Sequence, residues 1–235
     1  MNSLKPYFDL CRVSNLPTVW TNVLAAAILS GEGFSWPPVL LLGISMSLFY
    51  SGGMCLNDLW DREVDRVKRP SRPIPAGRVT LQRASRFAAL LFGIGLALLV
   101  LAPFPGSFFA GLTLLGLITA YDRIHKRVTW SVLLMAGCRL MVFVTVGLAV
   151  AGEIKGPVLI GGALQFVYIV VLSLVARYET RRPGGFSFPV IPWMLSAISL
   201  LDGLVMAAFV SSAWLVAGLA GALLTRLGQR YVRGD

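Results

Sequence analysis

Long apolar runs recur along the chain, and only short polar segments separate them. Inside a bilayer every backbone polar group must be paired within the protein, so runs of this length predict membrane-spanning helices. We therefore expect an all-α, polytopic transmembrane helix bundle that forms a single domain over residues 1–235. The runs predict eight spans, with nine as the alternative, at residues 15–30, 38–56, 84–102, 107–121, 129–151, 157–176, 188–210 and 212–227.

Positive charge is concentrated on one side of this predicted topology. Eight spans place both termini on the same side, and 19 of the 21 Lys and Arg residues fall on that side. Lys155 lies opposite and Arg139 lies inside a span. Because Lys-rich and Arg-rich loops stay in the cytosol, we expect both termini and the motif loops there, by default at a bacterial inner membrane. This bias explains the net charge of +10 without a nucleic-acid partner.

Cysteine and histidine offer little metal chemistry. Cys11, Cys55 and Cys138 are odd in number and widely spaced, so they match neither a disulfide framework nor a metal site, and we expect reduced packing residues. The single His125 excludes a site built from several histidines. The N-terminus lacks the pattern of a cleaved signal peptide, so the first span is expected to act as a signal anchor.

Polar residues occur inside several of the predicted spans, among them the first and the fifth. The first span carries a stripe that should face the bundle interior, for hydrogen bonds between helices or for ligand contact: Asn15, Thr18, Thr21 and Asn22. Arg139 lies near the middle of the fifth span, where its isolated charge costs at least ~2.5–3.5 kcal/mol. It should therefore bind substrate in a cavity or pair with an acid, and Asp202 is its mid-span counterpart.

The most acidic stretch of the sequence directly follows the second apolar run. Four of the 11 acidic residues fall within residues 57–65. Asn57, Asp61 and Asp65 are spaced i, i+4, i+8, so on one helix they stack along a face about two turns long. Asp58 lies beside that face. Close carboxylates repel each other unless a cation lies between them, and a hard divalent cation such as Mg²⁺ is the usual partner.

Basic residues follow this acidic stretch. Because Mg²⁺ binds one or two carboxylates together with phosphate oxygens, we expect a phosphorylated substrate. Arg69, Arg72 and Arg78 could hold its outer oxygens. The alternative is a solvated loop of mixed charge. It is disfavoured because the apolar run makes this cluster the end of a membrane helix, where ionisable groups indicate function.

The acidic and basic stretches together resemble the first signature of the UbiA superfamily of intramembrane prenyltransferases. The matching residues are Asn57-Asp58-x-x-Asp61-x-x-x-Asp65, followed by Lys68-Arg69-Pro70-x-Arg72-Pro73-Ile74-Pro75-x-Gly77. Tyr121-Asp122 with Lys126-Arg127 is similar to the family's Tyr and Lys-Arg loop after the fourth span. The resemblance extends from the first helix to about residue 185. It implies a bundle, usually of nine helices, around a central cavity open to lipid.

Members of this family use Mg²⁺ to bind an isoprenyl diphosphate and transfer its prenyl group to an acceptor. The resemblance makes Asp61 and Asp65 the catalytic residues. It implies substrate contacts by Asn57, Arg69, Arg72, Lys126, Arg177, Tyr121 and Arg139. It implies Mg²⁺ ligands at Asn57, Asp58, Asp61, Asp65, Glu179 and Asp122. For Asp122, an acceptor-side base and a simple helix cap stay open as alternatives.

The second family signature is altered in this sequence. Typical members carry Asp-x-x-x-Asp after the sixth span, whereas this chain has Ala176-Arg177-Tyr178-Glu179-Thr180. Arg177 could replace the charge of a second metal, or the second metal and the transferase activity could be lost. Together with Cys138-Arg139 and Gly184-Gly185, this stretch resembles a divergent branch, the UbiA-like members of ebo-type operons.

Two functions are therefore open. The first is an intramembrane prenyltransferase that transfers an isoprenyl group from a polyprenyl diphosphate to an aromatic or lipid acceptor, with Mg²⁺-assisted departure of diphosphate. The second is a catalytically degenerate relative that binds or transports a prenylated or lipid-linked compound. A CDP-alcohol phosphotransferase, a third alternative, is disfavoured because Asp202-Gly203 is not followed by the signature that such enzymes need.

Overall fold

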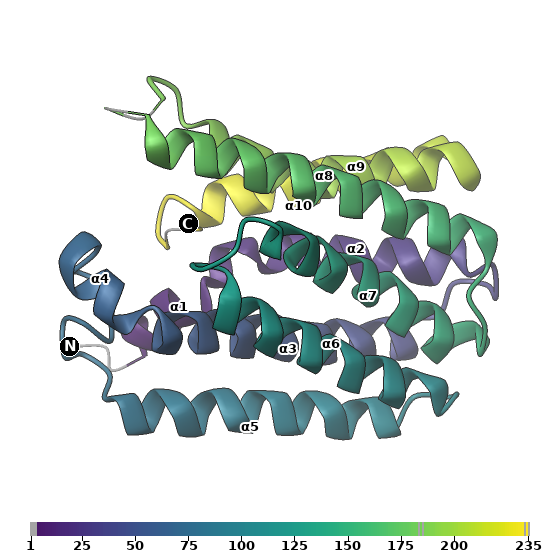
Figure 1. Cartoon of the computed structure of the whole chain (residues 1–235). Helices are drawn as coiled ribbons and strands as arrows, with labels where there is room; N and C mark the ends of the chain where they lie inside the picture. Colours follow the sequence, from purple (N-terminus) through teal and green to yellow (C-terminus); the bar gives the residue numbers. More distant parts are fainter. Residues whose placement is uncertain (1–3, 183, 185, 233, 235) are drawn as a thin grey trace.

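The computed structural model describes residues 4–182, 184, 186–232 and 234, and these ranges contain helices and turns but no strand. Eight long helices form the bundle in Figure 1: α2 (Leu16–Leu29), α3 (Trp36–Trp60), α5 (Leu81–Val100), α6 (Gly106–Ile124), α7 (Ser131–Ala151), α8 (Gly156–Arg181), α9 (Val190–Phe209) and α10 (Leu215–Gly228). The short elements are α1 (Lys5–Cys11), α4 (Arg62–Lys68) and the 3-10 turns Val13–Asn15 and Ser212–Trp214.

Each predicted span coincides with one of the eight long helices. Helices α3, α5, α7, α8 and α9 are long and apolar enough to cross a membrane, and the segments Val13–Leu29 and Ser212–Gly228 are shorter apolar helices. The all-α prediction is therefore confirmed. Prolines near the first turn help to start α2, α3 and α8, because their missing N–H group needs no partner there.

Helix α2 lies at the centre of the bundle. It packs against α3, α7, α8, α9 and α10. The polar stripe predicted to face inward is buried throughout: Asn15, Thr18, Thr21 and Asn22. This position gives the polar side chains of α2 access to partners on several helices at once.

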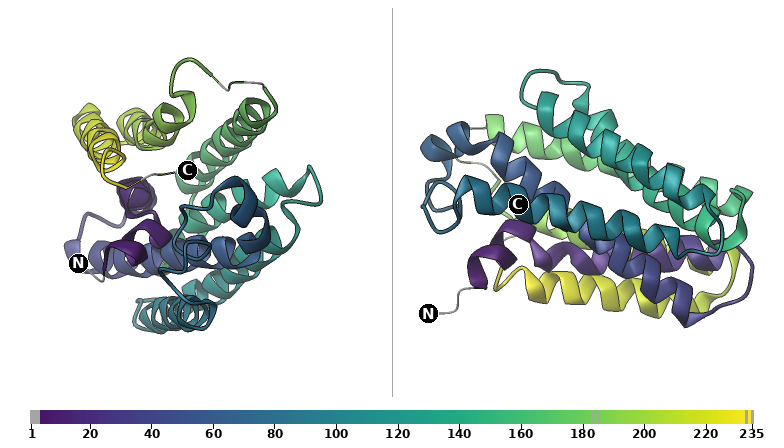
Figure 2. Two further views of the ribbon diagram at one scale, coloured as in Figure 1. Left: turned by 90° about the vertical axis from the view of Figure 1, so that its left-hand side faces the viewer. Right: turned by 90° about the horizontal axis from the view of Figure 1, so that it is seen from below.

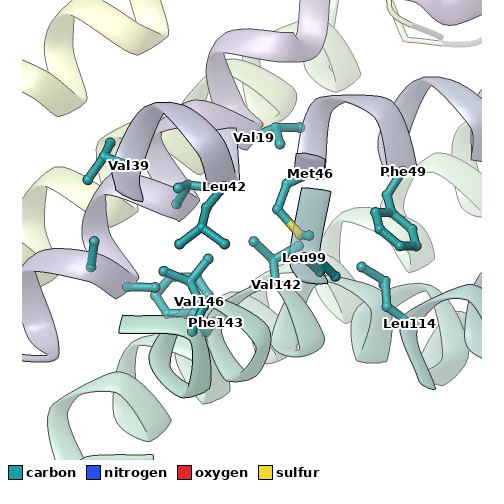
Figure 3. Packing of buried hydrophobic residues seen from close by; sticks show 14 of the residues in the cluster. Val19, Val39, Leu42, Met46, Phe49, Leu99, Leu114, Val142, Phe143 and Val146 are labelled. Carbon is teal, nitrogen blue, oxygen red and sulfur yellow. The ribbon is translucent and has the colours of Figure 1, made fainter. Parts of the chain in front are cut away.

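Helix α3 provides much of the apolar core. Leu42, Met46 and Phe49 point from α3 toward α5, α6 and α7 (Figure 3). Their labelled neighbours in Figure 3 include Leu99, Leu114, Val142, Phe143 and Val146. Apolar side chains gain little from leaving lipid, so this contact is stabilised mainly by close packing.

The predicted polar loops gather at one end of the bundle. Helices α1 and α4, the α6–α7 connection and the last turn of α10 lie at the left-hand end of Figure 1, which faces the viewer in the left panel of Figure 2. At the other end Lys155 forms an ion pair with Glu32 between the α7–α8 and α2–α3 connections. The side of the membrane on which the polar end lies stays a prediction, as does the single-domain organisation.

Candidate active site

The end of α3 directs two neighbouring side chains to opposite sides. Asn57 Nδ2 donates a 3.1 Å hydrogen bond to Asp122 Oδ1 on α6. Asp58 Oδ1 instead accepts from Arg12, at 3.2 Å, and from Arg72, at 3.0 Å. Successive residues of an α-helix are about 100° apart, which explains the divergence. The site therefore has two parts on either side of α3.

The inner group comprises Asn57, Asp61, Asp122, His125 and Lys126. Asp61 is 5% exposed, and its carboxylate lies 3.2 Å from His125 Nε2 and 3.0 Å from Lys126 Nζ. Burial alone would raise the pKa of Asp61, but His125 and Lys126 outweigh it and hold that pKa below its ordinary value. The carboxylate of Asp61 is thus kept ionised at neutral pH.

Asp122 is the unusual member of the inner group. It is buried, and its Oδ2 atom has no hydrogen-bond partner among the described residues. Its Oδ1 accepts from Asn57, and neither its own helix nor α7 uses its side chain as a cap. The interpretation of Asp122 as a helix cap is therefore wrong. A buried carboxylate oxygen without a donor is a position that a cation could occupy.

The outer group comprises Arg12, Asp58, Asp65 and Arg72. Arg72 Nη1 bridges the two acids, at 3.0 Å from Asp58 Oδ1 and 2.6 Å from Asp65 Oδ2. Residues seven apart on a helix differ in direction by only about 20°, whereas residues eight apart differ by about 80°. The chain also leaves α3 at Asp61 before α4 begins. Asp65 therefore shares a face with Asp58, and the predicted stack with Asn57 and Asp61 is divided.

Oxygen donors for Mg²⁺ are present in the inner group. Within the described ranges no three His, Cys, Asp or Glu side chains converge closely enough to form a ready metal site. Asn57, Asp61 and Asp122 nevertheless supply the hard oxygen atoms that Mg²⁺ prefers, and no described residue competes for Asp122 Oδ2. The donor chemistry therefore fits Mg²⁺ on this side of α3.

A cavity adjoins the inner group. Its volume is about 160 Å³, and Tyr121 and Asp122 are among its lining residues. The rest of its wall is mostly apolar and includes Met46, Met54 and Met135. Ligand pockets usually measure about 300–1,000 Å³, so a prenyl group would need this cavity to widen. Methionine side chains are flexible enough to allow such a change.

Arg139 lines the same cavity from α7. Its guanidinium donates to Asn22 Oδ1 at 2.6 Å and to Thr18 Oγ1 at 3.0 Å, both on α2. Asn22 Nδ2 in turn donates to both oxygens of Asp202, at 2.9 and 2.7 Å. Gln165 Nε2 adds a 2.7 Å bond to Asp202. Arg139 and Asp202 are thus connected through Asn22 and are not a direct pair.

The residues of the altered second signature lie elsewhere. Arg177 donates to the Thr129 carbonyl at 2.8 Å and to Ser131 Oγ at 2.9 Å, which ties the end of α8 to the start of α7. Glu179 is half-buried, and its side chain forms no hydrogen bond or ion pair within the described part of the chain. Neither residue contacts the inner group, so their substrate and metal roles stay predictions.

Sequence reasoning missed two members of the site. His125 contacts Asp61, and Tyr121 stacks on its ring with centroids 5.0 Å apart. Arg12 contacts Asp58 from the segment before the first span. His125 directly precedes Lys126, a predicted substrate contact, so its position could have indicated that it belongs to the site. For Arg12 no signal was available, because its place depends on how α1 packs against α3.

Comparison with known proteins gives the family. Residues 17–232 match the UbiA prenyltransferase family. The chain belongs to this family. Family membership and the five long apolar helices make it an integral membrane protein. The finer resemblance to members of ebo-type operons stays a prediction.

Several similar curated proteins are digeranylgeranylglyceryl phosphate synthases. The protein from Sulfurisphaera tokodaii is 34% identical over 116 residues, which are 49% of this chain and 42% of that protein. The protein from Methanothermobacter thermautotrophicus is 26% identical over 227 residues, which are 94% of this chain and 79% of that protein. The chain spans about half the length of the first curated relatives that it matches, with shares of 42% and 48%.

Solved structures share the fold at low sequence identity. A structure from work on digeranylgeranylglyceryl phosphate synthase in membranes has a TM-score of 0.67 at 20% identity, covering 99% of this chain and 96% of that one. A UbiA homologue from Archaeoglobus fulgidus bound to DMAPP and Mg²⁺ has a TM-score of 0.63 at 16% identity, covering 93% of this chain and 86% of that one. The predicted family and fold are therefore confirmed.

Proposed function

We propose that this protein is an Mg²⁺-dependent intramembrane prenyltransferase that transfers an isoprenyl group from a polyprenyl diphosphate to a lipid acceptor bearing a phosphate. One observation carries the proposal most directly: the unpartnered oxygen of Asp122 belongs to an inner group that adjoins an apolar cavity. An apolar cavity suits an isoprenyl chain, and oxygen donors beside it suit a metal-bound diphosphate.

The choice of acceptor is supported by the relatives. Digeranylgeranylglyceryl phosphate synthases are named for a lipid product that carries a phosphate. An aromatic acceptor, the other possibility raised by the sequence, has no such support here. We therefore propose a geranylgeranyl donor and a glyceryl phosphate lipid as the first pair to test.

The residues of the inner group would have different roles in binding the metal and the diphosphate. Asn57, Asp61 and Asp122 would hold Mg²⁺, which when bound would neutralise charge developing on the departing diphosphate. Lys126 and His125 contact Asp61 in this structure. Once Asp61 binds Mg²⁺, both side chains would be free to donate to the diphosphate oxygens. Tyr121 stacks on His125 and fixes the orientation of its ring.

The transfer itself needs few groups from the protein. The bond between the first prenyl carbon and the diphosphate oxygen breaks, and its electron pair stays on the diphosphate. The acceptor hydroxyl oxygen bonds to that carbon, and its proton passes to the released diphosphate. The mostly apolar wall of the cavity would disfavour water, which would otherwise capture the allylic cation.

Turnover by purified protein in lipid tests this proposal. Radiolabelled geranylgeranyl diphosphate is supplied with geranylgeranylglyceryl phosphate and Mg²⁺, and labelled lipid and diphosphate release are measured. Asp61→Asn should lower the rate at least ~100-fold, because a preorganised charged site is lost. Glu153→Gln, which changes an exposed acid in the α7–α8 connection, should keep the wild-type rate.

Two results would contradict the proposal. Full activity of Asp61→Asn would remove the inner group from the reaction. Tight donor binding without diphosphate release for any phosphate-bearing or aromatic acceptor would instead support the degenerate carrier.

A further inference from the structure

A second concave site lies on the opposite side of α3 from the inner group. This outer pocket has a volume of about 420 Å³. Helix α1 forms one wall, and the loop between α4 and α5 forms the other, including Pro70, Ser71 and Pro73. Asp58 also lines this pocket, because its side chain points toward Arg12 and Arg72 and away from the inner group.

The outer pocket carries an excess of positive charge. Two carboxylates line it, Asp9 and Asp58, and the cations that line it are Lys5, Arg12, Lys68, Arg69, Arg72 and Arg78. Asp65 adds one further acid behind Arg72. The cations still outnumber these acids by three. Such an excess in a concave site attracts an anion that carries more than one negative charge.

Two of these cations, Arg72 and Arg78, are held in position before any ligand binds. Arg72 is fixed by Asp58 and Asp65. Arg78 donates to the Ser71 carbonyl at 2.6 Å and lies 3.4 Å from Asp9 on α1. These contacts order side chains that would otherwise lose entropy on binding.

The backbone of the loop supports the same arrangement. The amides of Arg78 and Val79 both donate to the Pro73 carbonyl, at 3.0 and 3.1 Å. Gly77 has a φ of 69°, a left-handed conformation that glycine adopts without strain, and this turns the chain back toward Pro73. The loop is therefore a closed turn that presents Arg72 and Arg78 to the pocket together.

The charged lining of the outer pocket favours a phosphate headgroup over an isoprenoid chain. Guanidinium groups bind phosphate through paired N–H donors, and lysines add point charges. The lining of the central cavity, in contrast, is mostly apolar. Arg12 borders both spaces, so a ligand held in the outer pocket lies next to the cavity.

We propose that the outer pocket binds the phosphate monoester headgroup of the acceptor lipid, apart from the donor diphosphate at the inner group. This inference rests on the proposed function, because it assumes an acceptor that carries a phosphate. It gives the two phosphate-bearing substrates separate sites on either side of α3. The acceptor then enters with its headgroup at the polar end of the bundle.

The experiment measures binding and kinetics on the same variants. Dissociation constants for dioctanoyl phosphatidic acid and for inorganic phosphate are measured with the full chain in detergent, by native mass spectrometry. KM values for geranylgeranylglyceryl phosphate and geranylgeranyl diphosphate are measured in the turnover assay. The variants are Arg78→Gln and Lys68→Gln, with Arg66→Gln as the matched control because Arg66 pairs with Glu63 outside the pocket.

Lys68→Gln distinguishes a loss of phosphate binding from a loss of the fold. Arg78 also holds the loop to α1, so its loss could disturb the fold. The side chain of Lys68 is exposed and forms no hydrogen bond or ion pair within the described ranges, so its replacement leaves the loop intact. A circular dichroism melt of each variant checks that the fold is kept.

We expect both variants to weaken phosphatidic acid binding about tenfold and to raise the acceptor KM by a similar factor, since one charge-assisted contact is lost. The donor KM and kcat should stay within about twofold, and Arg66→Gln should match wild type. A rise in the donor KM alone would overturn the inference, as would equal affinity for inorganic phosphate and phosphatidic acid. If phosphatidic acid binding depends on Lys68 but no turnover is detected, the result supports the outer pocket as a binding site and rejects the proposed function.

Discussion

Replacing Asn22 with alanine removes the side chain that joins Arg139 to Asp202. Asn22 is fully buried, accepts from Arg139 and donates to both carboxylate oxygens of Asp202. Without it, Arg139 keeps its bonds to Thr18 and Asp202 keeps its bond to Gln165. Two buried ionic groups then lose a partner, and no water from the bilayer core replaces it.

The size of the effect follows from these contacts. A hydrogen bond to a charged group contributes about 1.5–3 kcal/mol in soluble proteins, whereas interhelical bonds in bilayers average about 0.6 kcal/mol. Breaking a buried ionic contact completely costs about 3–5 kcal/mol. Because Thr18 and Gln165 stay in place, we expect Asn22→Ala to lower the free energy of unfolding by about 2–4 kcal/mol. For a chain of this length that shifts Tm by on the order of 10 °C.

Unfolding in mixed micelles, followed by circular dichroism, measures this loss. Thr145→Val is the control, because Thr145 is equally buried but, among the described residues, donates only to the Met141 carbonyl of its own helix. Adding Asp202→Asn to Asn22→Ala should recover part of the stability, since the uncompensated negative charge is removed. The reasoning is refuted if Asn22→Ala costs no more than Thr145→Val, or if Asp202→Asn lowers the stability of the double variant further.

Three further predictions follow from the contacts described. Cys11 Sγ and Cys55 Sγ lie 3.8 Å apart, so a thiol oxidant should give an intramolecular disulfide between α1 and α3, seen as a gel shift that Cys55→Ser abolishes. A cysteine introduced at Ser71 should react with an impermeant maleimide only from the cytosol, and one at Gly33 only from the opposite side; the reverse pattern would invert the topology. Asp122→Asn should raise the Mg²⁺ concentration for half-maximal activity at least ~tenfold with unchanged protein yield, whereas an unchanged value would exclude Asp122 as a ligand.

The sequence predicted the spans well because hydropathy is a local property. Each of the eight apolar runs became a helix, since the bilayer leaves the backbone no other way to pair its polar groups. The inward direction of the α2 stripe was predicted on the same grounds. Boundaries differed mainly at polar ends, as at α3, which continues through Asn57 and Asp58 to Trp60.

The arrangement of the acidic site was less predictable because it depends on partners distant in the sequence. Asn57 and Asp61 meet side chains from the end of α6, whereas Asp65 meets Arg72 from the loop that folds back. Spacing along one helix gives no information about where that loop lies. The sequence pointed to Asp202 as the mid-span counterpart of Arg139, but it did not indicate that Asn22 lies between them, since that requires α2 to pack between α7 and α9.

The central position of α2 has a consequence for biosynthesis. Asn22 enters the membrane with the first long helix, but its partner Asp202 follows 180 residues later. At about 5–20 residues per second, translation leaves this amide without that partner for about 10–40 s. The first helix must therefore be shielded by the insertion machinery or by neighbouring helices until α9 arrives. A ribosome that stalls before α9 would leave the Asn22 amide in the bilayer without Asp202, and an unpaired polar group there is costly.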